Sequence, residues 1–392
     1  MSLFDKCMNF KDADFIRSLG YYPYFRIISS EQDTEVLVNG KKMLMMGSNS
    51  YLGLTNHPRV KEAALEAIKK YGTGCAGSRF LNGTLDIHIK LEEALAELVG
   101  KEASLVYATG YQANLGAIAP LVGKNDYIVT DKYDHASIID GCKLSYGEML
   151  RYSHNDMSSL ERVLQRLNGA EALIVVDGIF SMEGDIADIP NIVELCDKYN
   201  VSLMVDEAHS LGVLHSTGAG AAKYFDCTDK TALIMGTFSK SLASVGGFVA
   251  ADSKIIDYLK HHSRPLIFSA SLPPASAASV LAALQIMKEE PERIEQLWKN
   301  TNFMMKSFRE MGFDTGVSCT PVIPLHTGEM MTTFKMWRRL AEEGVFVNPI
   351  VPPAVPPNSC LIRCSFMATH TELQLEKALE KFKQIGKELA VI

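Results

Sequence analysis

The sequence lacks several features that would assign the chain to a specialised class of protein. No apolar run approaches the roughly 20 residues that a membrane-spanning helix needs. The first residues, Met1–Lys6, lack the apolar core of a signal peptide. Only 8 cysteines occur in 392 residues, and their spacing suits neither a disulfide scaffold nor a structural zinc site. We therefore expect a cytoplasmic protein without a metal, although a membrane-derived substrate, reached by a peripheral approach, stays open.

Clustered positive charge is also missing. The chain has 39 Lys and Arg against 46 Asp and Glu, a formal net charge of −7. Its densest basic cluster, Lys260–Arg264, is short and typical of a solvated helix end. Because nucleic-acid binding needs clustered cations to neutralise phosphates, we exclude nucleic acid as the main partner. With 47% hydrophobic residues, the composition is that of a globular protein of two or three domains.

Short apolar runs alternate with helical patterns through the middle of the chain, as in βα units on a parallel sheet. The predicted strands are Ala103–Tyr107, Asp126–Thr130, Ala172–Val176, Ser202–Val205, Ala232–Met235 and Gly246–Ala251. In open α/β sheets the ligand lies beyond the carboxyl ends of the strands. The residues just after these runs are therefore the candidate functional residues.

The pattern changes in the last third of the chain. A long helical stretch runs over Pro274–Phe308, and short strands are expected near Val322–Leu325 and Leu361–Ser365. A closing helix is predicted over Thr371–Leu389. The proline-rich segment Val351–Pro357 cannot be a helix or a central strand, so we expect a surface loop there.

The N-terminal segment is predicted to contain a helix followed by a hairpin over Thr34–Met46, with Asn39-Gly40 as its turn. The sequence thus predicts an α/β fold with a mainly parallel central sheet and a smaller α+β part. The expected division is an N-terminal segment at 1–50, a large cofactor-binding domain at 51–285 and a C-terminal domain at 286–392.

One glycine-rich motif has an interpretation that competes with the strand-end residues. Gly72–Gly77 satisfies the GxGxxG pattern of dinucleotide binding, which requires a strand before the motif and a helix after it. The preceding residues, Arg59–Tyr71, have helical periodicity instead. We favour a pocket-shaping loop, and keep a nucleotide-binding oxidoreductase or a nonenzymatic α/β binding protein as the alternative.

Two strand ends carry residues that together suggest pyridoxal phosphate (PLP) chemistry. Asp206 and His209 follow one apolar strand, and Lys240 follows the next, beside the hydroxyls of Thr237 and Ser239. PLP needs a lysine for covalent attachment, an acid facing its pyridine nitrogen and a donor at its ring hydroxyl. The three residue types occur here in the expected order.

Two further turns complete the predicted pocket. Thr109-Gly110-Tyr111 lies at a strand-to-helix turn whose main-chain N–H groups suit a phosphate. His135 follows another strand end and offers an imidazole to stack on an aromatic ring. Each feature alone is a capped helix start, but together with Lys240 they form a coherent cofactor site.

These residues resemble the α-oxoamine synthases, a family of fold-type I PLP enzymes, and within it the bacterial serine palmitoyltransferases most of all. The similarity runs along nearly the whole chain. The segments that carry it are Asn49–Leu54, Tyr71–Thr84, Asp134–Ile138, Asp206–Ser210, Gly236–Lys240 and Arg363–Thr371.

The resemblance implies a role for each site residue. The catalytic residues would be Lys240, which carries the cofactor and moves the α-proton, together with His135, Asp206 and His209. Cofactor contacts would also come from Gly110, Tyr111, Ser181, Ala208 and Thr237, and across a dimer interface from Ser269 or Ser271. Substrate contacts would come from Asn49, Arg79, His135 and Arg363, with Arg363 clamping the amino-acid carboxylate in a bidentate pair.

The implied reaction is a decarboxylative condensation of a small L-amino acid with a fatty acyl thioester, carried by coenzyme A or acyl carrier protein. With serine and a palmitoyl donor the product is 3-ketodihydrosphingosine. We expect serine, and leave open cysteate, glycine or alanine. The resemblance also implies a homodimer with a shared active site.

Overall fold

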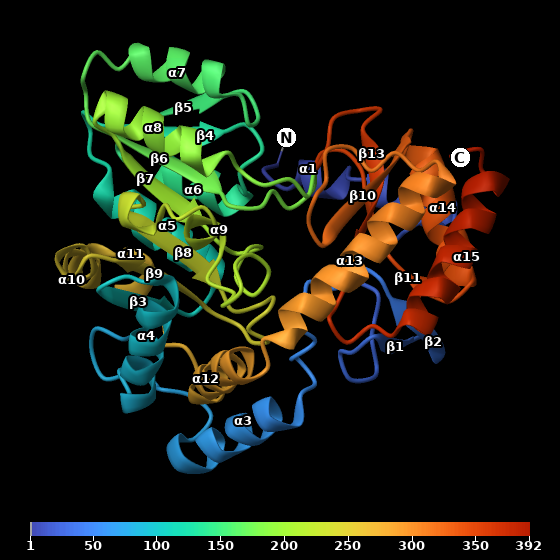
Figure 1. The fold of residues 1–392 in the computed structure, drawn as a ribbon, viewed down its shortest axis with the longest axis horizontal. Helices are drawn as coiled ribbons and strands as arrows, with labels where there is room; N and C mark the ends of the chain where they lie inside the picture. Colours follow the sequence, from blue (N-terminus) through green and yellow to red (C-terminus); the bar gives the residue numbers. More distant parts are fainter. Residues whose placement is uncertain (1) are drawn as a thin grey trace.

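The computed structural model describes residues 2–392, and its largest element is a seven-stranded sheet (Figure 1). The strands lie in the order β3-β9-β8-β7-β6-β4-β5, and β9 alone runs antiparallel to its neighbours. They are β3 (Ala103–Tyr107), β4 (Tyr127–Asp131), β5 (Glu148–Tyr152), β6 (Ala172–Asp177), β7 (Ser202–Asp206), β8 (Leu233–Thr237) and β9 (Gly247–Ala251). The mainly parallel central sheet is therefore confirmed.

Six of these strands are predicted from the sequence, and their observed first and last residues lie within two residues of the predicted ones. The sequence does not predict the seventh strand, β5. This strand lies at the edge of the sheet and exposes Glu148 and Arg151, so it has no continuous apolar run. Edge strands are paired on one side only, and their apolar signal is correspondingly weak.

Helices cover both faces of the sheet (Figure 1). In β6, Ile174 and Val176 belong to one apolar cluster and Leu173 and Val175 to another, as alternating side chains require. The flanking helices are α3 (Pro58–Tyr71), α4 (Asp86–Val99), α5 (Gly110–Leu121), α6 (Ala136–Leu144), α7 (Met157–Gln165), α8 (Ile189–Tyr199), α9 (Ala221–Tyr224), α10 (Ser253–His262), α11 (Arg264–Ile267) and α12 (Pro274–Glu289), with a 3-10 turn η1 (Thr228–Lys230). Burial on both faces explains why the strands are apolar throughout.

The last hundred residues form a smaller α+β layer with its own three-stranded sheet, β10-β13-β12. Its elements are α13 (Glu292–Met311), β10 (Val322–Gly328), α14 (Met330–Glu342), β11 (Val345–Phe346), β12 (Asn348–Ile350), β13 (Cys360–Ser365) and α15 (Glu372–Glu388). The proline-rich segment between β12 and β13 is a loop, as predicted.

The predicted single helical stretch over Pro274–Phe308 is wrong in one respect. The structure has two helices there, α12 and α13, with Glu290 and Pro291 between them. Proline has no N–H to donate within a helix and is tolerated at a helix start, so Pro291 ends one helix and begins the next. In Figure 1, α13 extends from the central-sheet region into the C-terminal layer.

The N-terminal hairpin consists of β1 (Glu35–Val38) and β2 (Lys41–Met45), joined by the predicted Asn39-Gly40 turn. Both turn residues have positive φ, 50° and 76°, which is the conformation that a two-residue type I′ turn requires. β2 also pairs in parallel with β11, so the hairpin packs on the C-terminal layer. The division into three parts at residues 50 and 285 stays a prediction.

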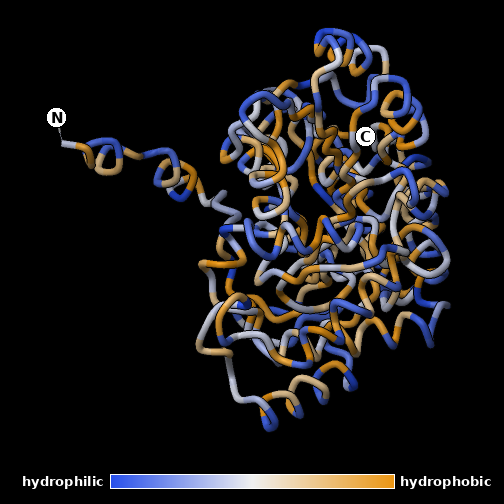
Figure 2. The backbone as a smooth tube through the Cα atoms, turned by 90° about the vertical axis from the view of Figure 1, so that its left-hand side faces the viewer, coloured by the Kyte–Doolittle hydropathy of each residue, from blue (hydrophilic) through white to orange (hydrophobic). Residues whose placement is uncertain are grey.

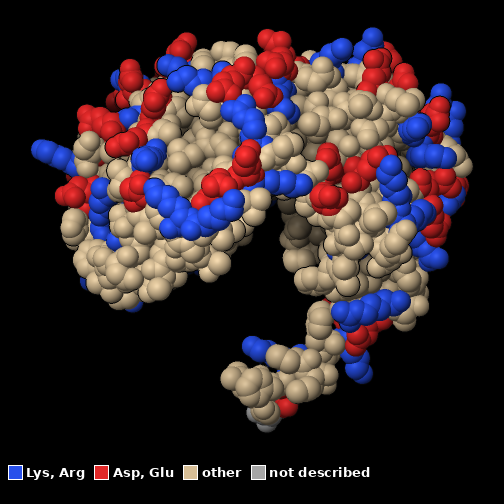
Figure 3. All heavy atoms as spheres, turned by 90° about the horizontal axis from the view of Figure 1, so that it is seen from below, with Lys and Arg blue, Asp and Glu red and all other residues tan. Residues whose placement is uncertain are grey.

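Two short helices, α1 (Asp5–Met8) and α2 (Asp12–Ser18), replace the single N-terminal helix that the sequence predicts. Neither buries a residue, and the segment projects away from the rest of the chain (Figure 2). Within residues 2–392, no helix combines the length and the apolarity needed to cross a membrane. Figure 3 shows acidic and basic side chains interspersed over one face of the molecule.

Candidate active site

A cavity of about 350 Å³ opens at the carboxyl ends of the central strands. Its walls come from the ends of β6, β7 and β8 and from the first turns of α5 and α6. The predicted site residues that line it are Gly110, Tyr111, His135, Asp206, Ala208, His209, Thr237 and Lys240. The sheet thus brings together residues that lie up to 130 positions apart in the chain.

Lys240 lies in the turn that follows β8. Removal of its amine from water lowers the pKa of Lys240 to about 8, although the carboxylates of Asp206 and Asp177 oppose this effect. A substantial fraction of the amine is therefore neutral near pH 8, and a neutral amine is the form that attacks a carbonyl carbon. The position suits the lysine that holds PLP.

Asp206 is the last residue of β7 and is buried. Its Oδ1 accepts a hydrogen bond from the main-chain N–H of Ala208 at 2.9 Å, and its Oδ2 accepts one from Nδ2 of Asn114 at 2.7 Å. These two donors fix the orientation of the carboxyl group. It lines the cavity, where it can face a pyridine nitrogen.

The two histidines of the cavity are both held in neutral form. Burial lowers the pKa of His209 well below its usual value, and the charges of Lys240 and Arg363 lower it further. Nδ1 of His209 hydrogen-bonds the hydroxyl of Tyr51 at 2.7 Å, so Nε2 remains for the cavity. Burial also lowers the pKa of His135, which caps the N-terminus of α6.

The start of α5 forms a cradle suited to an anion. Thr109 caps the helix by accepting a hydrogen bond from the N–H of Gln112, and the first-turn N–H groups of Gly110 and Tyr111 have no partner inside the helix. A Cβ atom on Gly110 would lie 2.6 Å from Oγ1 of Thr237, so only glycine lets this hydroxyl approach the turn. N–H groups, the helix dipole and a hydroxyl together fit a phosphate.

These features fit PLP as a set. One cavity holds an amine, a carboxyl group, two neutral imidazoles and an anion cradle, which are the groups that its aldehyde, ring nitrogen, ring face, hydroxyl and phosphate require. By contrast, the side chains of residues 2–392 include no cluster of three or more His, Cys, Asp or Glu placed to hold a metal ion.

Arg363 lies on β13 of the C-terminal layer and does not itself line the cavity. Its charge acts on Tyr51, whose hydroxyl hydrogen-bonds Nδ1 of His209 in the cavity wall. Nε of Arg363 donates to the main-chain oxygen of Ser181 at 2.6 Å, and its Nη1 donates to Oδ1 of Asn49 at 3.1 Å. A guanidinium has five N–H donors, so three remain for a ligand. Its charge also lowers the pKa values of Lys240 and His209, which burial lowers first.

Three other predicted site residues are engaged outside this cavity. Arg79 forms a bidentate ion pair with Glu92 at 2.8 and 3.0 Å, and both side chains are 7% exposed. Ser269 accepts a hydrogen bond from Gln112, and Ser271 donates one to the main-chain oxygen of Gly77. Their roles toward substrate and cofactor stay predictions.

The structure adds Asp177, Asn114 and Tyr51, which the sequence does not single out. Asp177 ends β6 and pairs in register with Asp206 on β7, so the strand-end argument applied to Asp206 also identifies it. Asn114 lies inside α5 and Tyr51 precedes the first helix of the large layer, and neither has a local signal of function.

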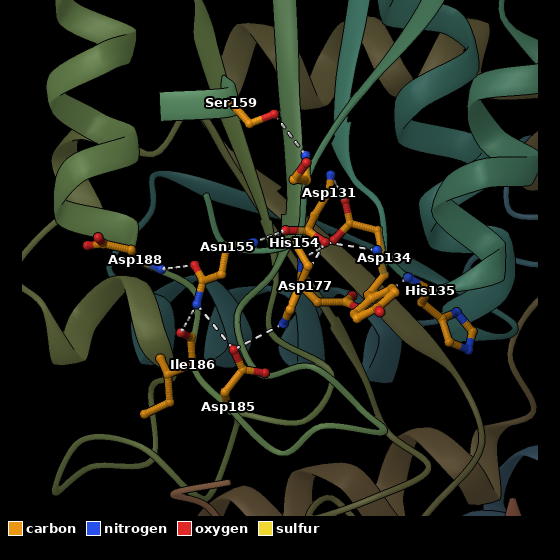
Figure 4. A network of polar contacts seen from close by, with 12 residues as sticks. Asp131, Asp134, His135, His154, Asn155, Ser159, Asp177, Asp185, Ile186 and Asp188 are labelled. Atoms are coloured by element: carbon orange, nitrogen blue, oxygen red, sulfur yellow. Dashed lines mark hydrogen bonds and ion pairs between the residues drawn. The ribbon is translucent and has the colours of Figure 1, made fainter. Parts of the chain in front are cut away.

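A buried polar network lies behind His135 (Figure 4). The main-chain N–H of His135 donates to Oδ2 of Asp177 at 3.1 Å, and the N–H of Asp177 donates to Oδ1 of Asp134 at 2.9 Å. Burial and neighbouring carboxyl groups raise the pKa values of both aspartates well above their usual range. The network ties the turn that carries His135 to the end of β6.

The network continues to a charged histidine. His154 pairs with Asp131 at 3.0 Å and with Asp185 at 3.2 Å. Burial lowers the pKa of His154, but the hydrogen bonds and charges of the two aspartates outweigh this effect and raise it to about 10. His154 is therefore protonated at neutral pH and offsets part of the negative charge of Asp131 and Asp185. Figure 4 shows the contacts of this network.

The glycine-rich motif at Gly72–Gly77 directly follows helix α3 rather than a strand, as its preceding residues predict. Without a strand before it, the motif does not place a pyrophosphate on a helix start in the way that dinucleotide-binding folds do. The geometry of this segment gives no support to the oxidoreductase alternative.

Comparisons with known proteins agree with the geometry of the site. Residues 41–382 match the family model for aminotransferase class I and II. The chain is 56% identical to a serine palmitoyltransferase of Sphingobacterium spiritivorum, over 99% of this chain and 98% of that protein. It is 43% identical to an 8-amino-7-oxononanoate synthase of Geobacter sulfurreducens, over 96% and 97%. A solved serine palmitoyltransferase of S. paucimobilis with bound PLP and myriocin superposes over the full length of both chains, with a TM-score of 0.96 and 34% identity.

Proposed function

The chain belongs to the aminotransferase class I and II family, and from this premise we propose that it joins L-serine to a long-chain fatty acyl thioester. PLP is its cofactor, and its reaction is of the acyltransferase type that serine palmitoyltransferases and 8-amino-7-oxononanoate synthases share. The serine α-carbon loses its proton and forms a bond to the thioester carbonyl carbon, and the carbon–sulfur bond breaks so that the thiol leaves. The serine carboxyl group then leaves as carbon dioxide, and a proton returns to the α-carbon. With a palmitoyl donor the product is 3-ketodihydrosphingosine.

Each residue of the cavity has a separate role in the proposed reaction. Bound PLP supplies an electron sink for the electron pair on the α-carbon. Lys240 would hold the cofactor before substrate arrives and would then move the α-proton, for which a pKa of about 8 is well matched to neutral conditions. With PLP bound, Asp206 would keep a proton on the pyridine nitrogen, His135 would cover the ring face, and neutral His209 would donate to the ring hydroxyl.

The observation that carries the proposal is the convergence of Lys240, Asp206 and His209 on one cavity, with the charge of Arg363 acting on Tyr51 behind His209. The first three suit PLP, and the three remaining donors of Arg363 suit the carboxylate of an amino acid. Asn49 and Ser181 orient the guanidinium through the two donors that they occupy.

The ion pair of Arg79 favours serine over cysteate. A sulfonate carries a full charge, and burying it requires at least one further cation or several N–H donors. Arg79 is the cation that the sequence offers for this purpose, but Glu92 neutralises it. The serine hydroxyl needs only one hydrogen-bonding partner, and the phosphate of bound PLP can provide it.

The test compares four amino acids. The absorbance of the PLP-loaded enzyme is titrated with L-serine, L-cysteate, glycine and L-alanine, and carbon dioxide release is then measured with palmitoyl thioesters of coenzyme A and of acyl carrier protein. We expect serine to have the largest kcat/KM. A larger value for cysteate, glycine or alanine would contradict the serine assignment and leave the reaction type intact.

We also propose that the working enzyme is a homodimer. The cavity mouth carries the exposed side chains of Tyr111 and Val245, and Phe268, beside Ser269, is 75% exposed. Apolar side chains gathered at a site entrance are stabilised when a second copy of the chain covers them. A fully active monomer in light scattering at assay concentration would contradict this proposal.

A further inference from the structure

A chain of hydrogen bonds connects two of the proposed catalytic residues, Asp206 and His135. Nδ2 of Asn114 lies 2.7 Å from Oδ2 of Asp206 and 2.8 Å from Oγ of Ser137. Oγ of Ser137 lies 2.7 Å from Nδ1 of His135. Asn114 and Ser137, the two connecting residues, are at most 1% exposed, and neither belongs to the predicted site.

The donor and acceptor properties of these four side chains determine which atom donates each of the hydrogen bonds that connect them. The carboxylate of Asp206 only accepts, so Asn114 must present its amide nitrogen, and the two hydrogens of that nitrogen serve Asp206 and Ser137. The hydroxyl of Ser137 accepts from Asn114 and therefore donates its own hydrogen to Nδ1 of His135.

A second donor reaches the same nitrogen of His135. The main-chain N–H of Ser137 lies 3.3 Å from Nδ1 and can only donate. Nδ1 is thus an acceptor for two donors and carries no hydrogen. Because the imidazole of His135 is neutral, its single N–H is on Nε2.

Close packing of two helices brings the connecting residues together. Asn114 lies in α5 and Ser137 in the first turn of α6. On the facing side of α6, a Cβ atom at Gly141 would lie 3.2 Å from the main-chain oxygen of Asn114. Glycine at this position lets the helices approach closely enough for the amide and the hydroxyl to meet.

We propose that Asn114 and Ser137 are positioning residues, which tie the imidazole of His135 to the carboxyl group of Asp206 and keep the imidazole proton on Nε2. The consequence of this inference rests on the proposed function. Asp206 and His135 would contact the ring nitrogen and the ring face of one bound PLP, so their relative placement would set the orientation of the ring. Nε2–H is then the donor that His135 offers to a substrate carboxylate in the cavity.

The first test reads the tautomer directly. PLP-loaded enzyme with 15N-labelled histidine rings is compared with Ser137→Ala, Asn114→Asp and the control Ser159→Ala, and the His135 signals are identified by their loss in His135→Gln. Ser159 is a matched control, because it is also a buried serine in the first turn of a helix and hydrogen-bonds the N–H of Ser153, outside the cavity.

We expect wild type and Ser159→Ala to show an unprotonated Nδ1 and a protonated Nε2. Asn114→Asp replaces the donor with a group that accepts from Ser137, so the hydroxyl turns away from His135 and a form with a proton on Nδ1 should appear. The Ser137→Ala variant should show 15N signals of both neutral tautomers of His135 instead of one. A proton on Nδ1 in wild type, or unchanged spectra in both variants, would overturn the proposal.

The second test separates positioning from stability. Ser137→Ala should lower kcat for carbon dioxide release about tenfold, the value of one hydrogen bond, with little change in the KM of the acyl donor. It should also change the visible circular dichroism of bound PLP, which reports the ring's orientation. Loss of thermal stability with unchanged kcat and dichroism would assign Ser137 a merely structural role.

The two proposals fail in different ways. If wild type shows the expected tautomer and the variants shift it, but serine is not turned over, the proposed function is wrong and the positioning role stands. If serine is turned over and the spectra do not respond to either variant, the positioning role is wrong and the function stands.

Discussion

Replacement of Arg363 by lysine tests the substrate site most directly. Arg363 is 5% exposed, and its guanidinium uses two donors on Ser181 and Asn49, which leaves three for a substrate carboxylate. A lysine keeps the positive charge but has only three donors at a single point, so it cannot serve both protein acceptors and a carboxylate in bidentate geometry.

The size of the effect follows from the bonds that are lost. One hydrogen bond between charged groups is worth about 2 kcal/mol, and at 1.4 kcal/mol per factor of ten this weakens serine binding about 30-fold. The dissociation constant is measured by titrating the absorbance of bound PLP with L-serine. The affinity for PLP and the KM of the acyl thioester should change little, because neither ligand contacts Arg363 in the proposed arrangement.

Arg339→Lys is the matched control. Arg339 also forms ion pairs, with Glu342 and Glu388, but it lies on α14 at the surface and does not line the cavity. We expect this variant to bind serine as wild type does. If Arg363→Lys binds serine within twofold of wild type, or if both variants weaken binding equally, the carboxylate contact assigned to Arg363 is wrong.

Four further predictions concern the cofactor and the fold. Lys240→Ala should abolish covalent attachment of PLP, and mass spectrometry after borohydride reduction should find the pyridoxyl group on Lys240 in wild type; an adduct on another lysine would contradict the assignment. Asp206→Asn should keep the fold and lose most α-proton exchange, measured by deuterium incorporation into serine, and near-normal exchange would refute the role of Asp206. The rate at which PLP-free enzyme takes up PLP should rise with pH and reach half its maximum near pH 8, because the neutral amine of Lys240 is the attacking form; a flat profile between pH 7 and 9 would contradict the lowered pKa. Glu92→Gln should lower the free energy of unfolding by about 3 kcal/mol, since it leaves Arg79 buried without its counter-charge, and a change below about 1 kcal/mol in urea unfolding would show that the pair contributes little.

The sequence predicted the central sheet and the residues at its functional edge for one physical reason. Strands buried on both faces are apolar throughout, and the carboxyl ends of parallel strands meet at one edge. Lys240, Asp206 and His209 follow such strands within a few residues, so their convergence could be inferred from local pattern alone. The same reasoning fails for β5, whose exposed edge leaves no apolar run.

The hydrogen-bond partners of the site residues could not be predicted from local sequence patterns. Arg79 could be assigned to a substrate from its motif, but the structure pairs it with Glu92, one helix further along the chain. Tyr51 contacts His209 across 158 positions, and Asn114 contacts Asp206 across 92. Neither pair leaves a periodic or motif signal.

The sequence by itself determined which side chains stand at the end of each strand, because alternation along a strand and the parallel order of the sheet fix the edge that they reach. Only the tertiary structure decided which donors and acceptors of those side chains are already used and which remain free. Helix packing sets this outcome: α5 and α6 approach closely enough for Asn114 and Ser137 to meet between Asp206 and His135. The protonation and orientation of the site residues therefore depend on contacts between segments that are distant in the chain.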